Sequence, residues 1–458
     1  MTESNLKKTW LALSPEAIEG DILTQFIIPS LLPSWNFEGN EFCIEYLTGK
    51  GGDKVDLAVR KNTTTDNFAH TKSNPFLIIE LKKRMLDLST GSKDYRKAVV
   101  QLKRYLDPSA TNCKTVRWAI LTNGNYIQLF RRHGRVVYPY TENILLTPDN
   151  IDEKIALIKK YIDHPEKGLS VALYNNKGGV GKTTTTINLA GVLSLPAPFG
   201  FNQKVLVVDF DPNQKDLSDL LKFKAPALKL SEFFLDYKNH NIEDVISTYR
   251  LKAKANNQVF GFDIIPADEA FLEMDQNTIN SLGIGTLRKS LSSLRNIYDY
   301  ILIDSPPGHG FFNRDAIAAS DVVLMPSKHN GIASFKNAAL AIKSIFPSIG
   351  ENRRTYQSEL GNPFPLPIFF NGEQISNAQK QQAQNAIREI IEQVKTEDKV
   401  DLTPFFFPKY TSTHKNLEIF ELPNYAHISS ASFSKHPAVF NNKKAREYYS
   451  DLVREYFI

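Results

Sequence analysis

The stretch that best indicates the fold is Lys177-Gly178-Gly179-Val180-Gly181-Lys182-Thr183-Thr184. It lies between the apolar run 171–174 and the segment 185–190. This order predicts a strand, a glycine-rich loop and the start of a helix. Glycines let backbone N–H groups point at an anion, and the helix start adds unpaired N–H groups and the positive end of its dipole. We therefore predict a phosphate-binding loop in which Lys182 reaches the β- and γ-phosphates and Thr183 ligates Mg²⁺. Asn176 stands where the G-x-x-x-x-G-K-[ST] pattern has its first glycine.

Composition sets broad limits. The chain has 458 residues, 42% of them hydrophobic, which predicts a globular protein of two or three domains. A net charge of +5 permits a polyanionic partner without requiring one. The two cysteines, Cys43 and Cys113, cannot form a zinc site by themselves and favour a reducing compartment. Because no apolar leader or run of about 20 apolar residues is present, we expect a cytoplasmic protein without a membrane partner.

After the phosphate loop, apolar strands alternate with helical segments, which predicts a doubly wound α/β domain with a parallel sheet. The strands are expected at 170–174, 204–210, 262–265, 300–304, 322–326 and 367–371. Two of these strands end in carboxylates. The strand at 204–210 carries Asp209 and is followed by Asp211, and the strand at 300–304 ends in Asp304. Open α/β sheets bind ligands at the carboxyl ends of their strands. We therefore expect one carboxylate to hold Mg²⁺ through water and another to position the water that attacks the γ-phosphorus.

These motifs together resemble the deviant-Walker ATPases of the ParA/MinD family, over nearly all of residues 168–458. The resemblance implies ATP and Mg²⁺ as cofactors and an ATP-sandwich homodimer, in which Lys177 crosses to the partner's nucleotide. It assigns water positioning to Asp211 and metal binding to Thr183, Asp209 and Asp304. Asn371 resembles the adenine-contacting asparagine of that family, although an asparagine at a strand end is a turn residue at least as often. Asn213-Gln214-Lys215-Asp216 replaces the usual Gln-Gly-Asn after Asp211-Pro212.

The first third of the chain predicts a small sheet with flanking helices. Ser14-Pro15 is typical of a helix start, and this helix should end near Pro29. Strands are expected at 42–47, 55–59, 76–81, 118–121 and 126–130, with a helix over 93–106.

A second candidate site lies on two of these strands. Asp56 is followed 24 residues later by Glu80-Leu81-Lys82, and residues two apart on a strand share a face. Asp56 and Glu80 could then hold Mg²⁺ while Lys82 steadies the attacking water or the developing phosphate charge. From the residues alone, a solvated strand face is the commoner origin of this pattern.

Residues 15–135 resemble the N-terminal nuclease domain of type I restriction enzyme R subunits, which belongs to the PD-(D/E)xK superfamily. The resemblance rests on Asp56, Glu80 and Lys82, and on the Q-x-x-x-Y element formed by Gln101 and Tyr105, which in that family lies beside the active site and contacts DNA. Glu19 matches the acidic residue of the first helix, but Leu23 stands where the family usually has arginine. The resemblance implies a restriction-endonuclease-like α/β domain.

These patterns divide the chain into a nuclease-like domain (1–148), a connector helix and linker (149–168) and a ParA/MinD-like ATPase domain (169–458). The leading hypothesis is that an ATP-dependent dimer switch controls a Mg²⁺-dependent DNA endonuclease. A role in defence against foreign DNA would rest on the restriction analogy alone. The rival is a ParA-type partition or positioning ATPase whose first domain only binds DNA or an unidentified protein partner. Action on RNA stays open, since the nuclease fold does not fix the sugar.

The stretch 443–458 predicts an amphipathic helix. Acidic and basic residues mix on its polar face, which favours docking on the sheet over membrane anchoring. Lys435, Lys443, Lys444 and Arg446 could form a patch for the DNA backbone, whose affinity would be salt-dependent and independent of sequence.

Overall fold

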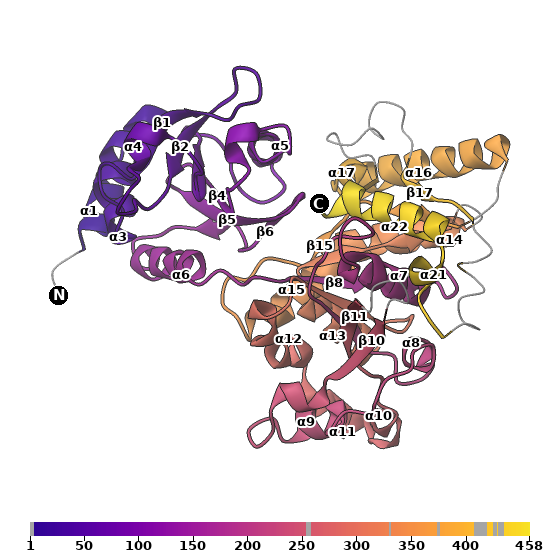
Figure 1. Cartoon of the computed structure of the whole chain (residues 1–458). Coiled ribbons are helices and arrows are strands. Elements are labelled where there is room, and N and C mark those ends of the chain that lie inside the picture. The colour runs from indigo at the N-terminus through magenta and orange to yellow at the C-terminus, as the bar shows by residue number, and fades with distance from the viewer. Residues whose placement is uncertain are drawn as a thin grey trace. The chain divides into compact units, whose positions relative to one another are not determined.

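The computed structural model describes residues 4–252, 258–328, 331–372, 376–406, 419–424, 428 and 435–458. The chain divides into two compact units. The first is formed mainly by residues 1–165, and the second by 166–358 and 362–456. Each unit has a seven-stranded sheet of its own, and Figure 1 follows the order of their elements along the chain.

The first unit is built on a mixed sheet in which the strands lie in the order β1-β2-β3-β4-β5-β6, with β7 paired to β5. β3 and β4 are parallel, and the other neighbouring strands are antiparallel. The five strands predicted in this region are confirmed. The strands are β1 (Phe42–Leu47), β2 (Lys54–Val59), β3 (Leu77–Leu81), β4 (Trp118–Thr122), β5 (Tyr126–His133), β6 (Val136–Pro139) and β7 (Ile144–Leu145).

Helix α5 (Lys93–Tyr105) joins β3 to β4, as a parallel pair requires, and buries Ala98, Leu102 and Tyr105 against the sheet. Its N-cap is Ser92, whose side chain accepts a hydrogen bond from the N–H of Tyr95. The other helices of the unit are α1 (Asn5–Ala12), α2 (Glu19–Ile22), the π-helical η1 (Leu23–Leu31), α3 (Leu32–Ser34), α4 (Phe68–Thr71) and α6 (Ile151–Asp163).

The predicted bounds of the first helix are wrong at both ends. The hydroxyl of Ser14 accepts from the N–H of Glu16 in a turn, and helix α2 begins only at Glu19. The helix also runs past Pro29, because residues 23–31 form wider π turns that shift the hydrogen-bond ladder around the missing N–H.

The second unit has a sheet with strands in the order β10-β11-β9-β12-β8-β13-β15. All neighbours are parallel except the hairpin of β10 and β11, which confirms the predicted parallel α/β fold for most of this sheet. The strands are β8 (Leu169–Leu173), β9 (Val205–Asp209), β10 (Ser247–Lys252), β11 (Val259–Ile265), β12 (Tyr300–Asp304), β13 (Val322–Leu324) and β15 (Phe364–Pro365).

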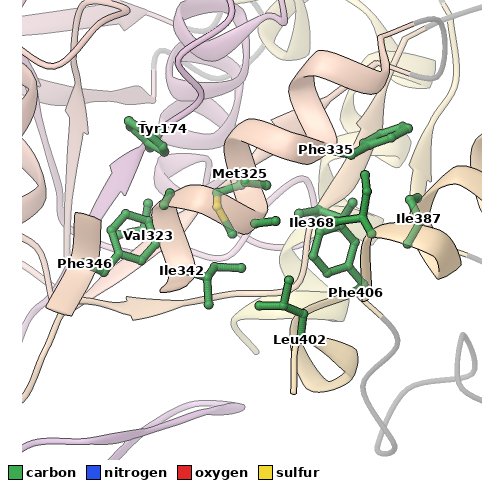
Figure 2. Packing of buried hydrophobic residues seen from close by; sticks show 14 of the residues in the cluster. Tyr174, Val323, Met325, Phe335, Ile342, Phe346, Ile368, Ile387, Leu402 and Phe406 are labelled. Atoms are coloured by element: carbon green, nitrogen blue, oxygen red, sulfur yellow. The ribbon is translucent and has the colours of Figure 1, made fainter. Parts of the chain in front are cut away.

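The last predicted strand does not join this sheet. β16 (Phe369–Asn371) instead pairs with β14 (Pro326–Ser327) and β17 (Glu421–Leu422) in a small parallel sheet. Beneath it lies an apolar core that includes Met325, Phe335, Ile368 and Ile387, shown in Figure 2. The core takes residues from both sheets and from α14 (Ile332–Leu340) and α16 (Asn377–Glu397), so the two sheets pack as one body.

Helix α7 (Lys182–Ser194) follows the phosphate loop and is buried around nearly its whole circumference. α21 (Ala438–Asn441) and α22 (Lys443–Tyr456) cover the side of α7 that the sheet leaves free. The predicted C-terminal helix therefore forms, but its apolar face docks mainly on α7, with a smaller contact to β17, rather than on the main sheet as predicted. No helix within the described ranges is long and apolar enough to span a membrane.

The remaining helices of the second unit cover the sheet or its loops. The α-helices are α8 (Asp216–Asp219), α9 (Leu230–Leu235), α10 (Ala270–Glu273), α11 (Gln276–Leu282), α12 (Thr286–Ser290), α13 (Phe311–Ala319), α15 (Phe346–Arg354) and α17 (Thr403–Phe406).

Candidate functional site

The predicted phosphate loop connects β8 to α7. Gly179 and Gly181 have φ angles of +70° and +86°, which L-residues with side chains rarely adopt. A Cβ on Gly178 or Gly179 would meet no other atom within 4 Å, so this face of the loop is open. The loop thus presents backbone N–H groups and the N-terminus of a 13-residue helix to open space, which suits an anion.

Lys182 lies at the base of this loop, 8% exposed. Its ammonium donates a long hydrogen bond of 3.4 Å to the carbonyl of Asn175, two residues beyond the end of β8. Burial lowers the pKa of Lys182, and the charges of Asp304 and Asp211 oppose this shift. A buried cation held by one long bond would gain stronger partners from a phosphate group.

The two strand-end carboxylates Asp209 and Asp304 are paired in register across β9 and β12. Burial, together with the nearby charge of Asp209, raises the pKa of Asp304 to about 7. The hydroxyl of Thr183 hydrogen-bonds to Asp304, and that of Thr186 lies 3.5 Å from its Oδ1. Thr183, Asp304 and Lys182 therefore meet at the floor of the loop.

Asp209 and Asp211 are both engaged in local hydrogen bonds. Asp209 Oδ2 accepts from the hydroxyl and the N–H of Ser218, at 2.6 and 2.9 Å, and burial raises the pKa of Asp209 to about 6. Asp211 Oδ1 caps the following turn by accepting from the N–H groups of Asn213 and Gln214. In this geometry Asp209 fastens the segment after β9 to the sheet.

Two further predicted residues lie against the loop. The amide nitrogen of Asn371 donates to the carbonyl of Val180 at 2.9 Å and occupies the space that a Cβ on Gly181 would need. The ammonium of Lys177 rests against Gly331, at the N-cap of α14 in the same chain. Adenine contact by Asn371 and transfer of Lys177 to a partner's nucleotide stay predictions.

In the first unit, the structure brings Asp56, Glu80 and Lys82 together. Asp56 Oδ2 accepts from the N–H of Leu81 at 2.6 Å, and the ammonium of Lys82 donates to Glu80 Oε1 at 2.5 Å. Glu80 is 2% exposed. Burial, with the neighbouring charge of Asp56, raises the pKa of Glu80 to about 7. The solvated-face alternative therefore does not apply to Glu80.

Gln101 and Tyr105 on α5 lie beside this cluster. The amide of Gln101 donates to the Tyr105 hydroxyl at 2.6 Å, and burial raises the pKa of Tyr105, helped by the charges of Glu80 and Asp56. Glu19 lies half-exposed at the start of α2. Within the described part of the chain, no three His, Cys, Asp or Glu side chains are grouped closely enough to hold a metal ion, so Glu19 does not join Asp56 and Glu80.

The residues present fit Mg²⁺ at both sites only with further oxygen ligands. In the first unit Glu80 Oε2 is buried with no hydrogen-bond partner among the described residues, and two close carboxylates favour a divalent cation between them. In the second unit the Thr183 hydroxyl and Asp304 supply oxygen ligands. Mg²⁺ usually keeps several waters and takes only one or two protein carboxylates. Neither site therefore needs a third carboxylate to bind the ion.

Comparisons with known proteins bear on the second unit. A family profile described as "AAA domain" matches residues 169–350. The Chromosome-partitioning ATPase Soj of Treponema pallidum is 30% identical over 212 residues, which are 42% of this chain and 76% of that protein. The chain belongs to the ParA/MinD family of ATPases. The ParA/MinD portion lies in the second unit, which holds the phosphate loop.

Other relatives of this ParA/MinD chain are matched over less of their length. The Sporulation initiation inhibitor protein Soj of Bacillus subtilis is 31% identical over 161 residues, which are 35% of this chain and 58% of that protein. An uncharacterized protein of Mycobacterium tuberculosis is matched over 46% of its length. The chain thus spans about half the length of these relatives. The structure of a Cyanothece McdA variant in complex with ATP gives a TM-score of 0.45 at 19% identity, covering 64% of this chain and 99% of McdA.

Sequence reasoning missed several residues at the ParA/MinD site. Ser218, which binds Asp209, and Thr186, which approaches Asp304, carry no signal of their own in the sequence. Asn175 could have been found, because it lies two residues after β8 and just before the glycine-rich motif; its Oδ1 accepts from the N–H of Lys177 and its carbonyl from Lys182. His309, whose ring lies 3.0 Å from the amide of Asn176, was also missed.

Proposed function

We propose that the second unit binds and hydrolyses ATP as a switch of the ParA type, used in partitioning or positioning. The observation that carries this proposal is the open glycine loop with the buried Lys182 and Asp304 and the half-buried Thr183 at its base. Relatives named as ATPases, among them the Treponema pallidum protein, support it. ATP offers the phosphate chain that a cradle of backbone N–H groups and a lysine can hold.

The roles of the residues follow from their positions. Backbone N–H groups of 178–183 and the ammonium of Lys182 would hold the β- and γ-phosphates, while the Thr183 hydroxyl and the Asp304 carboxylate would hold Mg²⁺. Mg²⁺ supplies positive charge that offsets the charge of the phosphates in the transition state. Asp211, whose side chain now caps the turn after β9, orients the attacking water once that turn rearranges. Lys177 leaves Gly331 and reaches the nucleotide of a second copy, which forms the ATP-sandwich dimer.

The test measures phosphate release and the mass of the particle in solution. Wild-type protein should hydrolyse ATP with Mg²⁺, and Lys182→Ala should reduce hydrolysis to background because a cation facing the phosphates is lost. Lys395→Ala, on the exposed face of α16, is the matched control and should behave as wild type. Hydrolysis by Lys182→Ala at the wild-type rate would contradict the assignment of the loop.

A second candidate function concerns the first unit, and we infer it from the buried Asp56–Glu80–Lys82 cluster. Two carboxylates that accept a divalent cation, beside a lysine, form a set that can activate water against a phosphodiester. Further support comes from the order of the mixed sheet, with β3 parallel to β4 across α5, and from Gln101 and Tyr105 beside the cluster. On this proposal the ATP switch controls a Mg²⁺-dependent nuclease of the PD-(D/E)xK type.

The exposed face of α5 supports a nucleic-acid partner whether or not the first unit cuts. Lys93, Arg96, Lys97 and Arg104 all lie on exposed positions of this helix. Positions 93, 97 and 104 fall on one side and span roughly 16 Å at a rise of 1.5 Å per residue. Arg104 stacks over the ring of Tyr105 and also pairs with Asp53, so Lys93, Arg96 and Lys97 carry most of the charge that this face offers. A row of cations of this length matches the phosphates of a DNA or RNA strand.

Cleavage assays separate these alternatives. Supercoiled plasmid, linear duplex and single-stranded RNA are incubated with Mg²⁺, with and without ATP, and with wild-type or Glu80→Gln protein. Cleavage that Glu80→Gln abolishes supports the nuclease, and the substrate cut identifies the sugar. Binding without cleavage by both proteins, weakened by Arg96→Glu with Lys97→Glu but not by Lys114→Glu, supports a DNA-binding front unit on a partition ATPase.

A further inference from the structure

One side-chain contact ties the phosphate loop to the loop that follows β12. The amide nitrogen of Asn176 lies 3.0 Å from Nε2 of His309, a normal hydrogen-bond length. With the amide as donor, Nε2 accepts and the imidazole is neutral with its proton on Nδ1. Asn176 directly precedes Lys177, and His309 lies five residues after Asp304, so both ends of the contact belong to segments that build the nucleotide site.

The imidazole is held by this bond rather than by packing. His309 is exposed and stands between Gly308, whose φ is +106°, and Gly310. A Cβ on either glycine would meet nothing within 4 Å, so the loop can turn without repacking its surroundings. The ring can therefore change partners at small cost.

A bound nucleotide would offer the ring a stronger partner on the same side of the loop. The open face of Gly178 and Gly179 begins two residues after Asn176, and this face is where the proposed phosphates lie. A hydrogen bond from an imidazole to a phosphate oxygen is charge-assisted, whereas the bond to the Asn176 amide joins two neutral groups. A terminal phosphate within reach would draw the ring away from the amide. ADP has no terminal phosphate to offer.

We propose that His309 detects the γ-phosphate of ATP. With ATP bound, the imidazole leaves Asn176 and donates a hydrogen bond to a γ-phosphate oxygen; without a γ-phosphate, the imidazole stays hydrogen-bonded to Asn176. This inference rests on the proposed nucleotide site and adds to it a residue that discriminates ATP from ADP. His309 lies on the loop that connects Asp304 to α13, so the exchange takes place within the segment that follows β12 and only when a γ-phosphate is present. Asn176, at the position of the motif's first glycine, supplies the alternative partner.

The experiment compares the affinities of ADP and of the β,γ-imido analogue of ATP, both with Mg²⁺, by calorimetry. His309→Ala should weaken the analogue about tenfold and leave ADP within about twofold, as expected for one lost charge-assisted hydrogen bond. His309→Gln, which keeps an N–H donor, should recover part of the analogue's affinity. Asn176→Gly removes the competing partner and should leave the preference for the analogue unchanged or increased.

Several results would overturn the inference. These are equal losses for both nucleotides in His309→Ala, no loss for either, or a loss of preference in Asn176→Gly as large as that in His309→Ala, which would make the contact a structural tie. If the wild type binds neither nucleotide, and Lys182→Ala is indistinguishable from it, the proposed function fails as well. Wild-type binding with an unchanged ratio in His309→Ala overturns the role of His309 alone.

Discussion

Replacing Glu80 by glutamine should stabilise the first unit at alkaline pH and leave it unchanged near pH 4. Burial and the charge of Asp56 raise the pKa of Glu80 from 4.5 to about 7. Between pH 4.5 and about 7, the folded state therefore keeps a proton on Glu80 that the unfolded state has released. The favourable contribution of the protonated carboxyl is complete below pH 4.5 and is lost as the pH rises through 7.

The size of this effect follows from the shift. Each pKa unit corresponds to about 1.4 kcal/mol, so a shift from 4.5 to about 7 lowers the free energy of unfolding by about 3 kcal/mol at pH 8. Glutamine carries no charge and keeps the shape of the protonated acid. Glu80→Gln should therefore gain about 3 kcal/mol at pH 8 relative to wild type, and close to nothing at pH 4.

The chain offers a selective probe for this measurement. Its three tryptophans, Trp10, Trp35 and Trp118, all lie in the first unit, so tryptophan fluorescence in urea follows the unfolding of that unit. Glu16→Gln, at an exposed position, is the matched control. Mg²⁺ adds a second arm, because a cation held by Asp56 and Glu80 should stabilise wild type at pH 8 and not Glu80→Gln.

Two results would refute the reasoning. An equal increase in the free energy of unfolding for Glu80→Gln at pH 4 and pH 8 would mean that folding does not raise the pKa of Glu80. A destabilised Glu80→Gln at pH 8 would mean that the ion pair with Lys82 outweighs the burial and the repulsion from Asp56.

Three further predictions concern the second unit. Lys177→Ala should bind ATP with wild-type affinity yet stay monomeric in analytical ultracentrifugation with ATP; an ATP-induced dimer would show that the assignment of Lys177 is wrong. Gly181→Ala should abolish ATP binding in calorimetry, because the positive φ costs roughly 1–2 kcal/mol and the new methyl group collides with Asn371, whereas Gly52→Ala, in open space in the first unit, should still bind. Asp304→Asn should lose Mg²⁺-dependent hydrolysis and, since it removes a carboxyl whose pKa is raised to about 7, should raise the melting temperature at pH 8 more than at pH 5.

Much of both sites was predictable because short-range geometry determines it. Glu80 and Lys82 share a strand face by the two-residue repeat, and Asp209 and Asp304 meet because parallel strands align their carboxyl ends. The motif around Lys182 marks its own strand, loop and helix. In each case the signal is local to one strand or loop, and regular sheet geometry then brings the strand ends together.

The features that sequence reasoning missed depend on contacts between distant segments. Ser218 binds Asp209 through a loop whose path no periodicity indicates, and Asn176 meets His309 across two strand ends. The end of the first helix was wrongly predicted at Pro29, because the π turns that carry the helix past this proline leave no signal in the apolar pattern. β16 reads as another strand of the main sheet, but the chain breaks pairing after Leu324, and β14 then starts a second sheet.

The burial of α7 has a consequence for the synthesis of the chain. The outer side of this helix is covered by α21 and α22, with Val439 packed against Gly191 and the N–H of Val439 bonded to the Asn188 side chain. These partners leave the ribosome long after α7 does. Until they arrive, the helix that carries the phosphate loop exposes an apolar flank, so a nascent or truncated chain should recruit chaperones and bind nucleotide poorly. We therefore expect ATP binding to arise only after the segment 438–456 has been made.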